Sequence, residues 1–323
     1  MLDGHNLDAW DALVAAFLSS RKAIGRDYVN ERRILRNLRG FLEREGCADL
    51  DGALFDRWRA QFEHLSSSTR FAREHTVFKL CRYRRRSDPG CFLPDQESLA
   101  RQKPHALPMI VEPAQVAQLL AYASQLPPRG RSPSRAQVMR LAVVLLFTAG
   151  LRRGELVRLT LGDVDAHAGV LRIRESKFHK SRWVPLSTSA QAELQDYLVA
   201  RRQAGLDERP AAPLLCTAGA RAYTGCGFFN SFKLLLRSAG IRDSTGRCPR
   251  VQDFRHSFAV AALLRWYEAD ADVQSNLPKL ALYMGHVNIV STAYYLRWMP
   301  AVISQASARF AHSCAGVIEG GAS

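Results

Sequence analysis

Residues 137–156 read QVMRLAVVLLFTAGLRRGEL and combine a strongly apolar segment with a charged end. The apolar run from Leu141 to Phe147 predicts a buried helix over 137–148. Gly150 interrupts the helical pattern, and Arg152 follows almost at once. An arginine next to a core helix differs in context from the arginines of a solvated surface. The segment therefore predicts an α-rich core with a functional charge at its edge.

The rest of the chain is also rich in helical periodicity. Apolar residues recur at helical spacing before residue 88 and indicate a small domain of four helices. A series of prolines then predicts a linker. A second domain follows, and small polar residues end the chain. The expected organisation is a helical domain over 1–88, a linker over 89–112, a second domain over 113–311 and a flexible tail over 312–323.

The second domain carries a β signal between its helices. Residues 170–174 and 182–186 are β-like and flank the polar sequence Lys177-Phe178-His179-Lys180, which predicts a hairpin tip. The expected fold class is therefore mainly α with a small β-sheet (α+β). Helices are expected over 113–125, 137–148, 190–202, 227–239, 253–266, 278–285, 289–296 and 301–311.

The composition points to a polyanionic partner. The 323 residues include 45 Lys and Arg against 30 Asp and Glu, a net charge of +15, with a sequence pI near 9.9. Arginines dominate the cations, and arginine binds phosphate oxygens in a bidentate manner. Nucleic acid is thus the favoured partner, and the alternative is a basic surface without a ligand. The apolar runs are too short to span a membrane, and the N-terminus resembles no secretory signal, so a cytoplasmic, nucleoid-associated protein is expected.

The cysteines give no sign of a metal site. There are seven, and none form a CxxC pair, so we expect scattered buried thiols rather than a zinc site or a disulfide framework.

A separate basic run ends the fourth predicted helix, and it either contacts a phosphate backbone or forms a solvated helix end. Its cations are Arg82, Arg84, Arg85 and Arg86.

Four short segments carry motifs: Thr148–Leu156, Ser176-Lys177, Gln252–Ala259, and Leu282–His286 with Tyr295 nine residues further on. In order and spacing, they resemble the tyrosine recombinase (phage integrase) family. The resemblance covers roughly residues 107–311, and the N-terminal part fits the family's core-binding domain by length and helicity only. The sequence before Gly285-His286, Asp-Val-Gln-Ser-Asn-Leu-Pro-Lys-Leu, also resembles a transposon-borne branch.

The resemblance implies a nucleophile and two phosphate-binding arginines. Arg152 and Arg255 match the arginines that hold the non-bridging oxygens, and Arg153 is the less fitting neighbour of Arg152. Tyr295 matches the nucleophile by its spacing from His286, ahead of the adjacent Tyr294. Attack by tyrosine gives a 3′-phosphotyrosyl bond and frees a 5′-hydroxyl. Because the bond energy is conserved, the resemblance implies no cofactor, neither ATP nor a metal.

The remaining roles concern protons and positioning. Lys177 matches the general acid on the hairpin, and Lys180 is either a phosphate contact or the acid itself. His286 matches the family position that donates to a non-bridging oxygen. Glu155 lies three residues after Arg152 and is expected to position its neighbours.

Gln252 departs from the family pattern. The family has histidine three residues before the second arginine, and a glutamine amide donates a hydrogen bond but is no base near neutral pH. His256 follows Arg255 directly and is interpreted as structural, with a role as base left open.

The resemblance implies a metal- and ATP-independent site-specific DNA recombinase or integrase. It would clamp double-stranded DNA between a helical core-binding domain and a mixed α/β catalytic domain, as a homotetramer and with or without partner recombinases, in mobile-element integration or transposition. No membrane partner is expected. The rivals are a type IB topoisomerase-like enzyme, a catalytically silent accessory DNA-binding relative, which Gln252 favours, and an unrelated RNA-binding protein.

Overall fold

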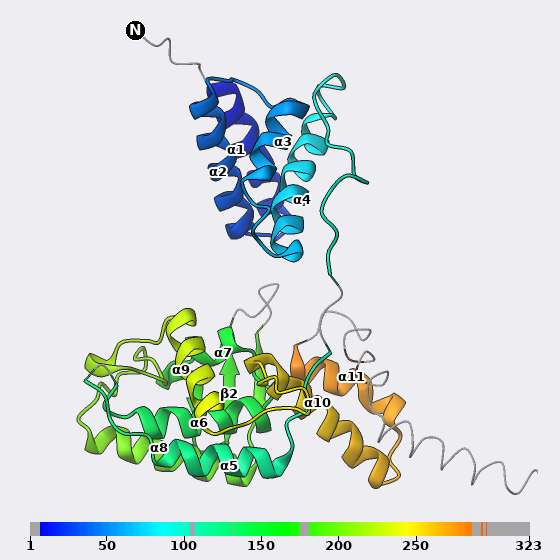
Figure 1. Cartoon of the computed structure of the whole chain (residues 1–323). Helices are drawn as coiled ribbons and strands as arrows, with labels where there is room; N and C mark the ends of the chain where they lie inside the picture. Colours follow the sequence, from blue (N-terminus) through cyan, green and yellow to red (C-terminus); the bar gives the residue numbers. More distant parts are fainter. Residues whose placement is uncertain are drawn as a thin grey trace, which may run out of the picture. The chain divides into compact units, whose positions relative to one another are not determined.

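The structure of the chain is a computed structural model. It describes residues 7–103, 107–130, 132–174 and 181–285, together with Thr292 and Tyr295. The chain divides into two compact units, Met1–Ala106 and Leu107–Ser323 (Figure 1). The described residues form eleven α-helices and one three-stranded antiparallel sheet. This confirms the expected fold class, mainly α with a small β-sheet.

The N-terminal unit is built from four helices around an apolar centre. Phe17, Leu38 and Trp58 are fully buried there, and the Trp58 indole donates a hydrogen bond of 3.1 Å to the Asn37 side chain. The N–H of a buried indole usually finds a hydrogen-bond partner, and this bond fixes the Trp58 ring in the core. The helices are α1 (Asp8–Ala23), α2 (Val29–Glu45), α3 (Gly52–Ala60) and α4 (Ser67–Arg84).

Helix α4 begins where hydroxyl residues predict a helix start. The Ser66 side chain accepts a hydrogen bond from the Thr69 amide, which satisfies one of the free N–H groups of the first turn. The basic run at the other end is not uniform. Arg84 forms ion pairs with Asp49 at 2.6 Å and Asp88 at 3.0 Å, which raise its pKa further. The exposed cations of the run are Arg82, Arg85 and Arg86.

Part of the segment expected as a linker packs on the N-terminal unit. Cys91 and Leu99 are buried, and Leu99 belongs to the same apolar cluster as Trp58. The Ala100 amide donates to the buried Glu74 carboxylate at 2.7 Å. These contacts hold the segment from Cys91 to Ala100 against the helices of the N-terminal unit.

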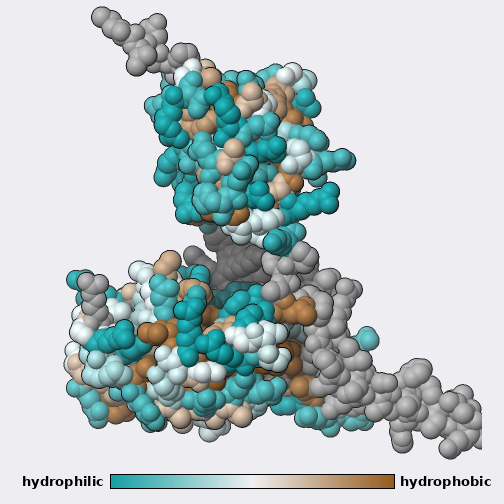
Figure 2. Space-filling view, in the orientation of Figure 1, coloured by the Kyte–Doolittle hydropathy of each residue, from teal (hydrophilic) through white to brown (hydrophobic). Residues whose placement is uncertain are grey.

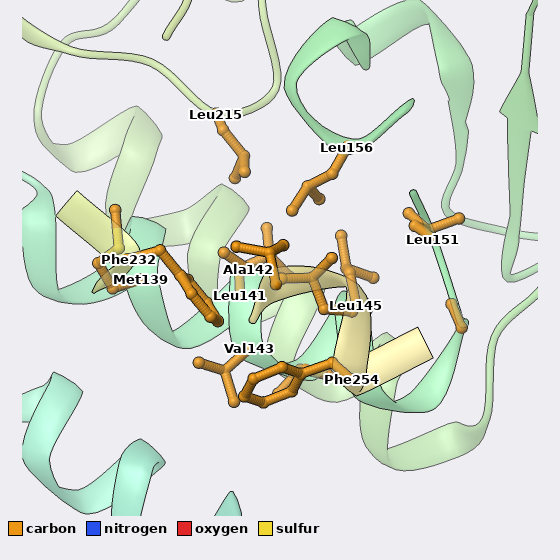
Figure 3. Close-up of a cluster of buried hydrophobic side chains, with 14 of the residues drawn as sticks. Met139, Leu141, Ala142, Val143, Leu145, Leu151, Leu156, Leu215, Phe232 and Phe254 are labelled. Atoms are coloured by element: carbon orange, nitrogen blue, oxygen red, sulfur yellow. The ribbon is translucent and has the colours of Figure 1, made fainter. Parts of the chain in front are cut away.

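The C-terminal unit is organised around α6 (Arg135–Thr148), the helix that the apolar run predicts. Side chains from every side of α6 are buried, including Val138, Leu141 and Leu145. Figure 3 shows Leu141 and Leu145 meeting residues from several other elements, with Phe254 below and Leu156 above. The neighbours of α6 include α5 (Pro113–Ser124), α7 (Arg153–Arg158), α8 (Thr188–Gln203) and α10 (Val251–Glu268).

The small sheet has the order β1-β2-β3 with antiparallel pairing. Leu171 pairs with Val184 and both are fully buried, so one face of the hairpin joins the core. The two longer strands are the predicted ones, and the third is a two-residue strand too short to leave a periodic signal. The strands are β1 (Val164–Asp165), β2 (Val170–Ile173) and β3 (Arg182–Pro185).

The two remaining helices of the described residues are α9 (Gly225–Ser238) and α11 (Val273–Met284). Helix α11 begins five residues before its predicted start, because the Asp272 side chain caps it by accepting from the Ser275 amide at 3.1 Å. Pro278 therefore lies inside the helix rather than at its first position. The helices predicted over 289–296 and 301–311 fall outside the described residues, Thr292 and Tyr295 apart.

Two surface features complete the description. No helix in the described ranges is long and apolar enough to cross a membrane. Figure 2 shows a mainly hydrophilic face on the N-terminal unit.

The six cysteines of the described part are free thiols, and Cys226 is exposed, so the prediction of buried thiols was wrong for it. Cys226 lies in the first turn of α9, where its side chain points away from the core face.

Candidate active site

Arg255 lies at the centre of the candidate site, on α10. Its residue is 1% exposed, and its guanidinium donates to the Gly150 carbonyl at 2.5 Å and to the Met284 carbonyl. These carbonyls lie just past the C-terminal end of α6 and at that of α11, where the helix dipole favours a cation. Arg255 thus joins two helices that are far apart in sequence.

Arg152 reaches the same place from the loop after α6. Gly150 has φ +58°, and an added Cβ would lie 2.6 Å from the Phe258 ring, so only glycine fits this turn. The turn directs the Arg152 guanidinium to the Gly285 carbonyl and to the Glu155 carboxylate, each at 2.7 Å. The chain reversal after α6 therefore places Arg152 beside the end of α11.

Glu155 is the anion that organises these arginines. Its side chain is 1% exposed and accepts hydrogen bonds from Arg152 and from both terminal nitrogens of Arg182. Burial alone would raise the pKa of this carboxyl, but the bonds and charge of Arg182 and Arg152 outweigh burial and hold the pKa at about 2. Glu155 is therefore ionised near neutral pH and orients cations rather than transferring protons.

Arg182, the first residue of β3, is a site residue that the sequence reasoning missed. Besides its two bonds to Glu155, it donates to the Tyr283 carbonyl at 2.7 Å. Three successive carbonyls at the end of α11, those of Tyr283, Met284 and Gly285, thus each receive a bond from a different arginine. No local pattern marks Arg182, because its partners come from distant parts of the chain.

The charge of this cluster is strongly positive. Among the described residues it holds three guanidinium groups and one carboxylate. Burial, followed by the charge of Arg152, lowers the pKa of Arg255 to about 9. An anion bound beside the guanidinium groups of Arg152 and Arg255 would offset both the repulsion between them and the cost of burying the Arg255 charge. Each guanidinium has five N–H donors. Only two or three of them donate to the carbonyl groups and to Glu155, so donors remain for phosphate oxygens.

Tyr295 and His256 meet beside Arg255. The Tyr295 hydroxyl lies 3.0 Å from His256 Nδ1, and Tyr295 is 4% exposed. The phenol is also close enough to influence the pKa of Arg255. Gln252, at the position where the family has histidine, is exposed in the first turn of α10. The structure therefore brings Arg152, Arg255, Glu155, His256 and Tyr295 together.

The other candidates lie outside the described residues. Lys177 and Lys180 fall in the connection between β2 and β3, and His286 directly follows Gly285. A cavity of about 450 Å³ lies at the root of this connection, with Glu155 in its wall. It is also lined by Arg158, Asp163, Arg172, Arg174 and Ser181.

A second basic hollow opens at the start of α9. This cavity of about 700 Å³ is lined by residues that include Arg129, Arg135, Arg221, Tyr223 and Thr224. Arginine forks, hydroxyl groups and a helix start are all suited to a phosphate group. Among the described residues, no group of three His, Cys, Asp or Glu side chains could hold a metal ion.

Gly285 should be essential to the cluster. It has φ +65°, and a Cβ there would lie 2.9 Å from an Arg182 nitrogen that is itself held by Glu155. We expect Gly285→Ala to lower the free energy of unfolding by about 2–3 kcal/mol, by combining left-handed strain with displacement of Arg182. Gly240→Ala is the matched control, because Gly240 has φ +70° with open space around it.

Urea denaturation of the two variants measures the difference. The Gly240→Ala variant should show the strain alone, about 1 kcal/mol. Equal losses in both variants would mean that the Arg182 contact contributes nothing to stability.

Comparison with known proteins gives a consistent result. Residues 110–300 match the phage integrase family. The integrase/recombinase y4rB of Sinorhizobium fredii is 35% identical over 305 residues, 92% of this chain and 95% of that protein. The tyrosine recombinase XerD of Ralstonia nicotianae is 30% identical over 251 residues, 76% of this chain and 74% of XerD.

The fold also matches solved structures. The Tn1549 transposon integrase, solved in complex with a circular intermediate DNA, superimposes with a TM-score of 0.64 at 18% identity, over 92% of this chain and 98% of that one. At this identity the match shows a shared fold. The family match covers more than half of the chain, and the y4rB match covers nearly all of it. The chain therefore belongs to the phage integrase family and is a tyrosine recombinase, an enzyme that cuts and rejoins DNA.

Proposed function

We propose that this recombinase moves a mobile element by integration or transposition, and that it cuts each strand of duplex DNA with Tyr295. Four copies would act together on two DNA sites. The observation that carries the chemistry is the meeting of Arg152 and Arg255 at the end of α11, with the Tyr295 phenol beside Arg255. The mobile-element setting rests on the resemblance of residues 272–286 to the transposon-borne branch.

The proposed reaction uses the positive cluster to bind the scissile phosphate. Arg152 and Arg255 would donate to its non-bridging oxygens and stabilise the charge that builds up in the transition state. The Tyr295 oxygen attacks phosphorus, and the bond from phosphorus to the 5′ oxygen breaks. A 3′-phosphotyrosyl bond forms, and the reverse attack by a 5′-hydroxyl rejoins a strand.

Two residues outside the described ranges complete the proposal. Lys177 would protonate the leaving 5′ oxygen; it belongs to the connection between β2 and β3, and the described residues at its two ends, Arg174 and Ser181, line the same cavity as Glu155. His286 would donate to the phosphate, since it follows the carbonyls that bind the three arginines. Glu155 would hold Arg152 in place, and Arg182 would hold the end of α11.

The covalent intermediate tests this proposal directly. A duplex from the ends of the encoding element, nicked near the cleavage site, lets the short fragment escape and traps the protein on DNA. After nuclease and protease digestion, mass spectrometry should find a nucleotide that is linked to Tyr295 through its 3′-phosphate. Attachment to Tyr294 would overturn the nucleophile assignment. Binding without any covalent product would favour the accessory DNA-binding role.

We also propose that the end of α4 contacts the DNA backbone. The exposed Arg82, Arg85 and Arg86 would neutralise phosphates, whereas Arg84 is occupied by Asp49 and Asp88. Replacing each exposed arginine by glutamine should reduce the slope of log Kd against log salt by about 1. Fluorescence anisotropy between about 50 and 200 mM salt measures this slope.

Arg202→Gln serves as a control for this prediction, because Arg202 is an exposed arginine near the end of α8, in the other unit. An equal change of slope in Arg202→Gln would show a general charge effect rather than a defined contact. An unchanged slope in all three α4 variants would mean that this helix end is only solvated.

A further inference from the structure

The contact between His256 and Tyr295 has the geometry of a proton transfer. His256 Nδ1 lies 3.0 Å from the Tyr295 oxygen, which is within hydrogen-bond reach of the proton to be removed. The ring centroids are 5.4 Å apart and the rings are tilted by 57°, so the nitrogen rather than the ring face meets the hydroxyl. Tyr295 is 4% exposed, so water has little access to the contact.

The position of His256 on α10 explains why it can take this part. Gln252 and His256 are four residues apart, so they project from the same face of the helix, one turn from each other. Gln252 is exposed, whereas His256 is partly buried against Tyr295. The imidazole that is missing from the first turn of α10 is therefore present one turn later.

We propose that His256 is the general base that accepts the Tyr295 proton, in place of the family histidine replaced here by Gln252. This rests on the proposed function of Tyr295 as nucleophile. The proton passes from the Tyr295 oxygen to His256 Nδ1 as that oxygen bonds to phosphorus. When a 5′-hydroxyl later displaces the tyrosine, His256 returns the proton to it, so the imidazole ends unchanged.

The ionisation state of His256 fits this role. Burial, aided by the charges of Arg250 and Arg255 and opposed by that of Asp253, lowers the pKa of His256 to about 4. The imidazole is therefore neutral near pH 7 and has a free lone pair, which lies on Nδ1 when Nε2 carries the proton. A DNA phosphate bound to Arg255 would offset part of the positive charge, so His256 becomes more basic when substrate is present.

The test isolates the nucleophile by using a 5′-bridging phosphorothiolate at the scissile position. A thiolate leaves without being protonated, so the single-turnover rate of covalent complex formation reports on Tyr295 and its base. The main variant is His256→Asn, whose side-chain oxygen can still accept the Tyr295 hydrogen bond but takes up no proton near neutral pH. His256→Gln is a second variant, and the double variant Gln252→His with His256→Asn tests rescue.

We expect the wild-type rate to be nearly flat between pH 7 and 9. The His256→Asn rate should be about 10²–10⁴-fold lower at pH 7. It should rise about tenfold per pH unit, because attack then depends on the fraction of tyrosinate, and a free phenol has a pKa near 10. The added Gln252→His substitution should restore part of the rate and flatten the profile.

Other outcomes overturn the assignment. A His256→Asn rate that stays flat with pH, reduced or not, would show that His256 only positions Tyr295. A faster rate would show that His256 restrains the tyrosine. If the wild type forms no covalent complex even with this substrate, the proposed function itself fails. DNA affinity and urea unfolding of each variant confirm that it is folded.

Discussion

Tyr295→Phe is expected to abolish covalent complex formation while leaving the protein folded and bound to DNA. The variant lacks the oxygen that would bond to phosphorus. The ring is expected to stay in its buried position, and the substitution removes the hydroxyl that meets His256 Nδ1. We expect the free energy of unfolding to change by about 1 kcal/mol.

The matched control is Tyr294→Phe, which removes the hydroxyl of the adjacent residue. Both variants are measured on nicked duplex by denaturing gel, with anisotropy for DNA affinity. Tyr294→Phe should retain the covalent band. A band that persists in Tyr295→Phe and disappears in Tyr294→Phe would reverse the assignment.

Arg255→Lys is expected to slow cleavage by about 10²–10³-fold, although the charge is kept. One guanidinium reaches the Gly150 and Met284 carbonyls in different directions and still has donors for a phosphate. An ammonium group is a point charge and cannot span these acceptors. Leaving a buried carbonyl unpaired should also lower the free energy of unfolding by about 1–3 kcal/mol.

Arg265→Lys on the same helix is the control, because Arg265 is exposed. Its unfolding free energy should change by less than about 0.5 kcal/mol. Rates are compared at saturating DNA, which separates the chemical step from binding. A full cleavage rate in Arg255→Lys would show that only the charge at this position matters.

The sequence was a good guide wherever the signal is local. The apolar run of α6 predicted the central helix, and the two β-like segments that flank a polar tip predicted β2 and β3. Arg152, Arg255 and Tyr295 carry motif spacing, so the resemblance could name them before any geometry was known. Their catalytic roles stay predictions, as do those of Lys177 and His286.

The remaining features depend on contacts between distant residues. Arg182 is one of 45 Lys and Arg residues, and only its bonds to Glu155 and Tyr283 distinguish it. Likewise, the sequence places His256 next to Arg255 but cannot show that it meets Tyr295, 39 residues away. The early start of α11 depended on a cap at Asp272 that the proline after it obscured.

The contacts at the end of α11 also determine when the arginine cluster can form during protein synthesis. The bonds that its three carbonyls receive from Arg152, Arg182 and Arg255 close chain segments of 133, 101 and 29 residues. A ribosome must therefore extend the chain as far as Gly285 before all three arginines can form these bonds. A polypeptide that ends before α11 would lack the acceptors that hold these three arginines together.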